Sequence, residues 1–265
     1  MIGTLSLAAA LTIIPSQAGT LNLVNIRTTY GNLGAQRTDN RYLPNDLFFV
    51  CFDIESLTVS PEGKVSYVIS MEVTDKANKA IFKPDRPSDR DDVLPLGGSR
   101  LAAYAFVALK PDQEPGTYNC RVTVVDKANN AKKTLEKQFD VVPKAFGLIA
   151  LNTTSDVEGN HPAPTSGIVG QDLFIHCALV GFGRGADKKP NGQVELRVYD
   201  EAKKPTLAKF PTAVMPAEVP ENDPVLFRFY VPFNREGTFT AELKATDNVS
   251  GKTSTISFPI KVLGR

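Results

Sequence analysis

The stretch that decides the fold occurs twice in this chain. Residues 116–130 read GTYNCRVTVVDKANN, and residues 237–251 read GTFTAELKATDNVSG. Apolar and polar residues alternate in both, as in a strand with one buried face. Each strand then runs into an Asn-rich or Gly-rich turn, which is typical of a hairpin. The pair therefore predicts the same strand and the same hairpin in two copies of one β unit.

Other segments repeat with a fixed spacing. MEVTDKANK (71–79) matches LRVYDEAKK (196–204), and IRTTY (26–30) matches LNTTS (151–155), both 125 positions later. A repeat of this length predicts two copies of one domain, at 19–143 and 144–265. The junction VVPKAFG contains Pro143 and has little slack, which predicts a restrained pair of domains.

Each copy has the pattern of an all-β domain. Short strand-like runs are separated by turn residues every ten or so positions. One such run alternates Ile256, Phe258, Ile260 and Val262 with Thr255, Ser257, Pro259 and Lys261. Outside the N-terminus, no ten-residue stretch has a convincing helical period. Short antiparallel strands with one apolar face are usually buried by packing two sheets together.

EPGTYNCRVTVVD (114–126) resembles the sixth strand of an immunoglobulin-like or fibronectin-III-like sandwich. That family places a tyrosine at the corner before this strand, and Tyr118 matches it, whereas the second copy has Phe239. The resemblance covers both copies and implies two tandem immunoglobulin-like antiparallel β-sandwich domains. It implies no activity, because the fold hosts many functions. The segments TTYGNLG, LPND, FDIESLTV and ALVGF also resemble uncharacterised exported proteins of planctomycete-type bacteria, which implies an extracytoplasmic location.

The N-terminus supports export. IGTLSLAAALTII is apolar and uncharged, and Ser16 and Ala18 are the small residues of a signal-peptidase site. Residues 1–18 are therefore predicted to be a signal peptide, although no basic residue precedes the apolar run. The alternative is a buried N-terminal strand or helix. This stretch is short for a transmembrane span, and no later segment qualifies.

Charge and aromatic content restrict the partners. Lys plus Arg number 30 and Asp plus Glu 29, so no basic field is available for nucleic acid or anionic lipid. The absence of tryptophan weakens a carbohydrate-binding interpretation, but seven tyrosines keep it open.

The cysteines test the alignment of the copies. DLFFVCF (46–52) and DLFIHCA (172–178) match Cys51 with Cys177, whereas the 125-residue spacing matches Cys51 with His176 and Phe52 with Cys177. The row Phe48, Val50, Phe52 and Ile54 is apolar and predicts the inner face, so Cys51 is expected on the outer face. Cys120 is expected inside. The immunoglobulin resemblance suggests a Cys51–Cys120 disulfide, which these opposite faces disfavour. Cys120 and Cys177 are then small buried hydrophobes.

Few residues are candidates for chemistry. His161 lies in a Pro-rich loop and is expected in solvent, and His176 is expected at the surface or between the domains. GFGRGADKKPNG (181–192) lacks the Gly-Lys-Ser/Thr of a phosphate loop and a following helix, so a loop between strands is preferred.

KPDRPSDRDD (83–92) could bring carboxylates to Ca²⁺, from Asp85, Asp89, Asp91 and Asp92. Arg86 and Arg90 are interleaved, however, and a solvated loop is preferred. Four other aspartates are expected to cap hairpin turns, namely Asp75, Asp126, Asp200 and Asp247. We therefore expect no catalytic, cofactor-binding or metal-binding residues.

The sequence predicts a non-enzymatic, extracytoplasmic (periplasmic or secreted) binding or envelope-structural protein. Its partner is expected to be a protein or a component of the cell envelope, bound by 83–100, by 183–193 or by an exposed edge strand. A periplasmic chaperone-like protein with an interdomain basic anchor is the alternative. A Ca²⁺-dependent hydrolase is a further one. The oligomeric state and the interdomain angle stay open.

Overall fold

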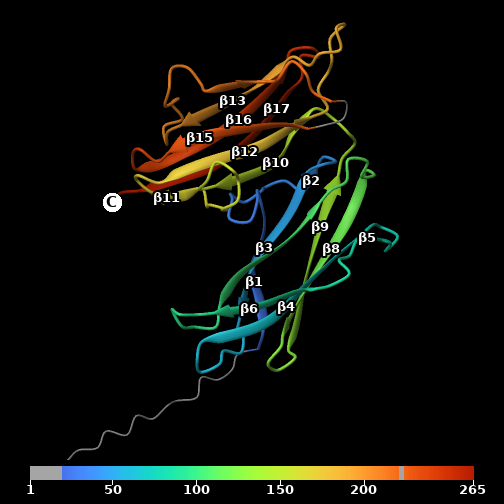
Figure 1. Ribbon diagram of the computed structural model, residues 1–265, viewed down its shortest axis with the longest axis vertical. Helices are drawn as coiled ribbons and strands as arrows, with labels where there is room; N and C mark the ends of the chain where they lie inside the picture. Colours follow the sequence, from blue (N-terminus) through green and yellow to red (C-terminus); the bar gives the residue numbers. More distant parts are fainter. Residues whose placement is uncertain (1–19, 221–223) are drawn as a thin grey trace, which may run out of the picture.

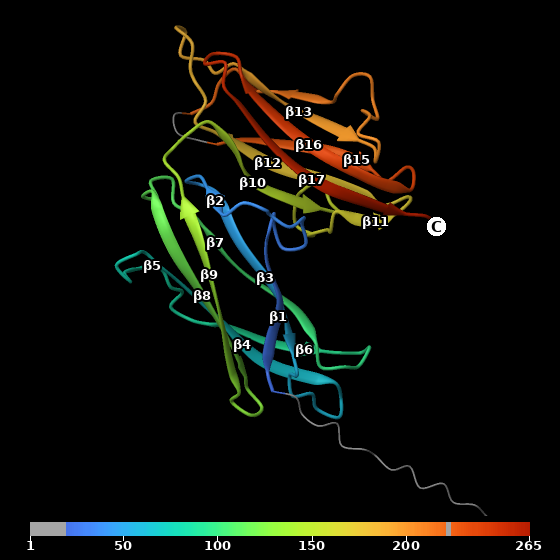
Figure 2. The ribbon, with the colours of Figure 1, turned by 180° about the vertical axis from the view of Figure 1, so that it is seen from behind.

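A computed structural model describes residues 20–220 and 224–265, and all regular structure in this part of the chain is β. Figures 1 and 2 show two sandwiches whose strands run at a steep angle to one another. The predicted signal peptide at 1–18 lies outside the described residues.

The first sandwich pairs a three-stranded sheet with a six-stranded one. The smaller sheet has the order β1 (Asn22–Thr29), β3 (Leu47–Glu55) and β7 (Leu101–Ala108). The larger sheet has the order β2 (Arg41–Tyr42), β9 (Lys132–Val141), β8 (Gly116–Asp126), β4 (Lys64–Thr74) and β5 (Ala80–Phe82), and β6 (Ser88–Val93) pairs with another part of β4.

The second sandwich repeats this order. One sheet consists of β10 (Gly147–Thr154), β12 (Asp172–Val180) and β15 (Val225–Pro232). The other consists of β11 (Ser166–Ile168), β17 (Thr253–Leu263), β16 (Gly237–Asp247), β13 (Gly192–Tyr199) and β14 (Thr212–Val214). Only the short pairs β2–β9 and β11–β17 are parallel. The prediction of two tandem immunoglobulin-like sandwiches is confirmed.

Strand pairing settles how the copies align. Cys51 is paired with Arg27 across β1 and β3, and His176 with Asn152 across β10 and β12. Both pairs follow a β-bulge, at Asn25 (φ 52°) and at Ala150 (φ 50°). The 125-residue spacing is therefore confirmed, and His176 is the counterpart of Cys51.

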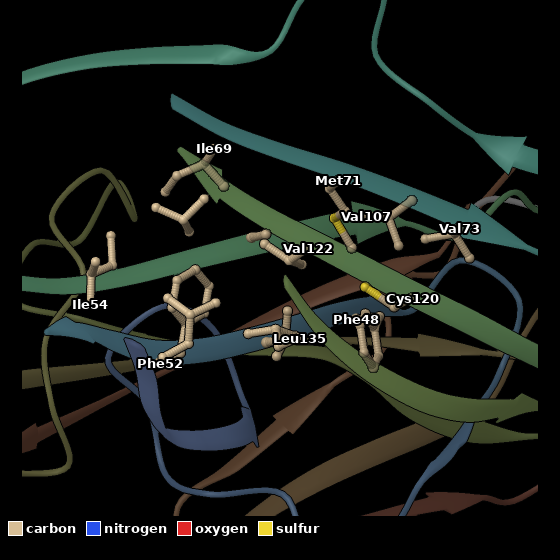
Figure 3. Packing of buried hydrophobic residues seen from close by; sticks show 14 of the residues in the cluster. Phe48, Phe52, Ile54, Ile69, Met71, Val73, Val107, Cys120, Val122 and Leu135 are labelled. Carbon is tan, nitrogen blue, oxygen red and sulfur yellow. The ribbon is translucent and has the colours of Figure 1, made fainter. Parts of the chain in front are cut away.

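The inner faces form two hydrophobic cores. Figure 3 shows Phe48, Phe52 and Ile54 of β3 packed against residues of the facing sheet, with Cys120 pointing into the same core. Cys177 lies in the second core. Both thiols are buried, as predicted, and the three cysteines are free.

The corner before β8 has the bond that the resemblance implied. The Tyr118 hydroxyl donates to the carbonyl of Glu114 (2.7 Å) and accepts from the Gln113 amide (2.8 Å). Phe239 lacks the hydroxyl, and the Arg235 guanidinium lies 4.9 Å from its ring centre instead.

Cys51 lies on the outer face of its sheet, opposite to Cys120, as predicted. That position is covered, however, and Cys51 is only 2% exposed. Its thiol is 3.1 Å from the Thr29 hydroxyl and donates to the carbonyl of Asn32 (3.1 Å), because the segment after β1 folds over this face.

The charged segment 83–92 corrects an expectation, because its second half is a strand rather than a loop. β6 pairs with Lys64–Ile69 of β4. Asp91 accepts from the Ser66 hydroxyl (2.6 Å) and Asp92 from the Tyr67 hydroxyl (2.9 Å), so side-chain bonds reinforce the pairing. Every residue of β6 is exposed, and the expected solvation of this segment is confirmed.

The aspartates expected to cap turns do so. Asp75 and Asp200 accept backbone N–H groups within their turns. Asp126 and Asp247 cap theirs and also hold a distant loop, since each accepts a further N–H at 2.8 Å, from Thr58 and Gly183 respectively. These two loop positions are again 125 residues apart.

The sandwiches meet through the segment between β1 and β3. Tyr30 and Ala35 pack into the core of the second sandwich beside Leu151. The Asp46 carboxylate accepts from the Ala150 N–H (2.8 Å) and from Arg37 (2.8 Å), whose guanidinium lies 3.8 Å from the Tyr42 ring centre. A Cβ at Gly31 (φ 77°) would overlap the Asn152 side chain, so this approach requires glycine.

Candidate functional site

A groove of about 560 Å³ runs along the open edge of the first sandwich, between β7 and the segment 82–90. β7 is the last strand of its sheet, so its outer edge has no partner among the described residues. Ile69 and Met71 of β4 and Ala105 of β7 line the groove.

Small side chains leave this edge hollow. The pair Val50–Ala105 in β3 and β7 corresponds to the larger pair Ile175–Phe229 in β12 and β15. At the neighbouring pair, each sandwich has one phenylalanine and one small residue, but on opposite strands. Phe52 of β3 lies opposite Ala103 in the first sandwich, whereas Cys177 of β12 lies opposite Phe227 in the second. The first sandwich therefore has smaller side chains than the second at the Val50–Ala105 pair, and the groove lies beside Ala105.

The opposite wall contains a gap in strand pairing. β4 pairs with β6 over Lys64–Ile69 and with β5 at Val73 and Thr74. Positions 70–72 of β4 have no partner on this side within the described chain. The segment 83–87 bends away here and forms the outer wall of the groove.

Basic side chains outnumber acidic ones in the lining of the groove, where Glu72 and Asp85 are the acidic residues. Lys83 is paired with Glu72 (3.2 Å) and Arg121 with Glu136 (2.9 Å). Arg86 and Arg90 also line the groove. Neither has an ion-pair partner in the described part of the chain, so two guanidinium groups are available to an acidic ligand.

Aromatic side chains continue the site onto the outer face of the β3–β7 sheet. Phe106 is 47% exposed, and its ring stacks on Phe49 with the centres 4.9 Å apart. Tyr104 lies beside both rings. An apolar ledge thus borders the free edge of β7.

The segment 83–100, singled out from the sequence, supplies one wall of this groove. The loop 183–193 does not reach it, and Arg184 of that loop donates to the carbonyls of Val219 (2.8 Å) and Pro220 (2.9 Å). The sequence analysis did not identify β7 as part of a site. Alignment of the two copies could have indicated it, because Ala103 and Ala105 stand where the second copy has Phe227 and Phe229.

The Asp-rich segment does not gather its carboxylates. Asp89 pairs with Lys127 (2.9 Å), while Asp91 and Asp92 bond to different residues of β4 on opposite faces of β6. Over residues 20–220 and 224–265 there is no group of three or more His, Cys, Asp or Glu side chains suited to a metal ion.

The histidines lie near each other in the second sandwich. His161 is exposed beside Asp156 (3.4 Å), and His176 bonds to the Thr154 hydroxyl (2.8 Å) through Nε2. Burial, and then the charge of Arg228, lower the pKa of His176. Neither histidine lies at the groove.

Burial dominates the chemistry of the two core cysteines. It raises the pKa of both Cys120 and Cys177 to about 12, so neither thiol has thiolate character near neutral pH.

No protein-family model matches the sequence, and no curated protein matches it. Among solved structures, the C-terminal domain of the AgI/II polypeptide BspA of Streptococcus agalactiae is 8% identical, with a TM-score of 0.30 over 89% of this chain and 99% of that chain. The C-terminal domain of the antigen I/II-family protein AspA of Streptococcus pyogenes is 10% identical, with a TM-score of 0.30 over 92% and 100%.

Red sea bream transglutaminase is 8% identical, with a TM-score of 0.28 over 94% of this chain but only 32% of that chain. TM-scores this low carry no conclusion about function. The resemblance to planctomycete-type exported proteins gains no support from these comparisons. Nothing in the described chain forms a helix with the length and apolar character needed to cross a membrane.

Proposed function

We propose that the protein is a non-enzymatic, extracytoplasmic binding protein that captures an extended, acidic segment of a partner protein along β7. The observation that carries the proposal is the coincidence of a free strand edge with a groove in the first sandwich. A bound strand would pair with β7 and place alternate side chains in the groove.

The chemistry of the walls supports the choice of partner. Arg86 and Arg90 favour carboxylates, whereas the floor of Ile69, Met71 and Ala105 favours apolar side chains. A segment that carries both apolar and acidic side chains meets both requirements, with the apolar side chains on the floor and the acidic ones on the two arginines.

The chaperone-like alternative has less support. Lys144 and Arg184 line a crevice of about 320 Å³ between the sandwiches, but the Arg184 guanidinium already bonds to backbone carbonyls. The apolar side chains of β9, which such a protein would offer to a subunit, are buried in their own core: Leu135, Phe139 and Val141. Lys137 interrupts their row.

Fluorescently labelled twelve-residue peptides test the proposal. We expect a peptide of alternating Val and Glu to bind, a Val/Lys peptide to bind at least tenfold more weakly, and a backbone N-methylated Val/Glu peptide not to bind. Ala105→Phe, which introduces the residue found at position 229, should abolish binding. Arg86→Glu combined with Arg90→Glu should weaken it at least tenfold.

Lys133→Glu is the matched control, because it reverses a charge on β9, which belongs to the same sheet as β6 but is separated from β4 by β8. It should bind like the unmodified protein, and thermal unfolding should show that each variant is folded. Binding that persists in Ala105→Phe, or that ignores N-methylation, would contradict the proposal. If the protein binds glycans but no peptide, the binding site would instead be a glycan site on the aromatic ledge of Phe49, Tyr104 and Phe106.

A further inference from the structure

The second sandwich has a pocket of its own, at the end where β11 and the C-terminus lie in Figure 1. Its volume is about 590 Å³, and every residue that lines it belongs to the second sandwich. Apolar side chains from both sheets form its interior, namely Leu196, Val198, Phe233, Phe239, Ile260 and Val262.

At the corresponding end of the first sandwich, aromatic rings fill the core, and the pocket of about 520 Å³ there is lined mainly by polar residues of the turns. Tyr42 is fully buried and meets Phe48 and Phe139 edge-on, with ring centres 5.4 and 5.5 Å apart. Phe48 stacks on Phe139 (4.2 Å), and Tyr118 also stacks on Phe139 (5.6 Å).

Strand pairing identifies the counterparts of these four rings. Tyr42 is paired with Val141, and Gly167 is paired with Val262. Gly167 therefore stands at the position of Tyr42. In the same way, Leu173 corresponds to Phe48, Ile260 to Phe139 and Phe239 to Tyr118.

Three of the four positions are therefore smaller in the second sandwich. Phe233 occupies part of the vacated space, since a Cβ at Gly167 would lie 2.9 Å from its ring. The pocket opens beside Phe233.

The polar groups at the pocket point to an anion. The Arg235 guanidinium lies over the Phe239 ring, and it has no ion-pair partner among the described residues. Asp200 is the acidic residue of the lining, and its carboxylate is engaged by the Lys204 N–H (2.9 Å) as a turn cap. An unpaired cation beside an apolar pocket suits a carboxylate attached to an apolar body.

We propose that this pocket binds a carboxylate with an aromatic or branched apolar body, with the body between the sheets and the carboxylate on Arg235. A small arylalkyl acid and the C-terminal residue of a peptide share this chemistry. The site is independent of the groove along β7, and either can fail without the other.

Titrations followed by the backbone amide signals of Phe233 and Phe239 test the assignment. We expect 3-phenylpropionate to bind about tenfold or more tightly than 3-phenylpropanol, because only the carboxylate can form an ion pair with the Arg235 guanidinium. A pentapeptide ending in Phe, with a free or an amidated C-terminus, distinguishes the two sources of the ligand.

Arg235→Gln should reduce the affinity for the acid to that for the alcohol, since this exposed substitution leaves the fold intact. Ile260→Phe, the residue at position 139, should block both, with thermal unfolding as the check on folding. Lys252→Gln, an exposed change in the β16–β17 turn, is the control and should have no effect. Equal affinity for acid and alcohol, unchanged binding in Arg235→Gln, or no binding of any probe to the unmodified protein overturns the proposal.

Discussion

Tyr118 and Phe239 occupy the same corner in the two sandwiches, and only the tyrosine bonds to backbone. Tyr118→Phe removes the bond to Glu114 while keeping the ring against Phe139. We expect the first sandwich to lose about 1 kcal/mol of unfolding free energy, the usual net value of such a bond.

Urea unfolding followed by amide signals of each sandwich measures this loss. Tyr104→Phe is the control, because no hydrogen bond of its hydroxyl occurs within the described chain. Equal stability of Tyr118→Phe and the unmodified protein would show that the corner bond contributes nothing.

His176 makes the second sandwich sensitive to pH. Burial and Arg228 lower its pKa in the fold, so the unfolded chain takes up a proton more readily. Stability is then retained above the ordinary histidine pKa near 6.5 and falls as the pH drops below it. We expect a lower unfolding midpoint of the second sandwich at pH 5.5 than at pH 7.5.

His176→Gln should reduce this difference, whereas His161→Gln at an exposed position should preserve it. If the difference survives in His176→Gln, the pH dependence belongs to other groups.

Single residues also show how far the sequence could be interpreted. Period-two alternation correctly placed Phe52 inside and Cys51 outside. It could not show that Cys51 is covered, because coverage depends on the path of 30–35 after β1. Alternation assigns a side chain to a face of a sheet, and only tertiary structure determines what lies on that face.

Among the elements, β6 is an exposed edge strand protected by charge. Asp89, Asp91 and Asp92 leave an edge that other chains cannot readily extend. Replacing all three with Thr should promote self-association, visible as larger species in sedimentation velocity. Asp85→Thr, just outside the strand, is the control and should stay in the same state as the unmodified protein. Unchanged sedimentation of the triple variant would mean that the charges do not protect this edge.

The two sides of the groove, the segment 83–92 and β7, could not be predicted equally well from the sequence. The charge of 83–92 correctly indicated exposure but concealed a strand, because charged residues are depleted in strands and this one depends on Ser66 and Tyr67. β7 was hidden for a different reason. Its alanines matter only once pairing sets Ala105 beside Val50, whose counterparts are both larger.

For the whole molecule, the joint between the sandwiches depends on Asp46. Its side chain and that of Arg37 are 4% and 9% exposed, and their pairing also fixes the Ala150 N–H. Asp46→Ala removes the buried partner of the Arg37 guanidinium and leaves it only the exposed Asp39. Losing one partner of a buried pair costs about 3–5 kcal/mol when no partner remains, so we expect a loss below that range. We expect the sandwiches to unfold in two separate calorimetric transitions. In small-angle X-ray scattering, the distribution of interatomic distances should broaden, because the sandwiches would no longer keep one relative orientation.

Asp39→Ala is the control, because Asp39 also pairs with Arg37 but is 52% exposed. It should change the joint little. A single transition at an unchanged temperature in Asp46→Ala would exclude a role for this carboxylate in the joint.

The bulge at Ala150 has a consequence for assembly. Its counterpart at Asn25 has the same backbone conformation, and the neighbouring Ile26 is 42% exposed, where Leu151 is covered. Yet Asn25 is bonded to Asp53, which is paired with Arg100, whereas the position equivalent to Asp53 in the second sandwich is the buried Ala178. A second copy docking here would have to desolvate this ion pair. Docking of a second copy through this contact is therefore disfavoured, and we do not expect the chain to assemble head to tail through it.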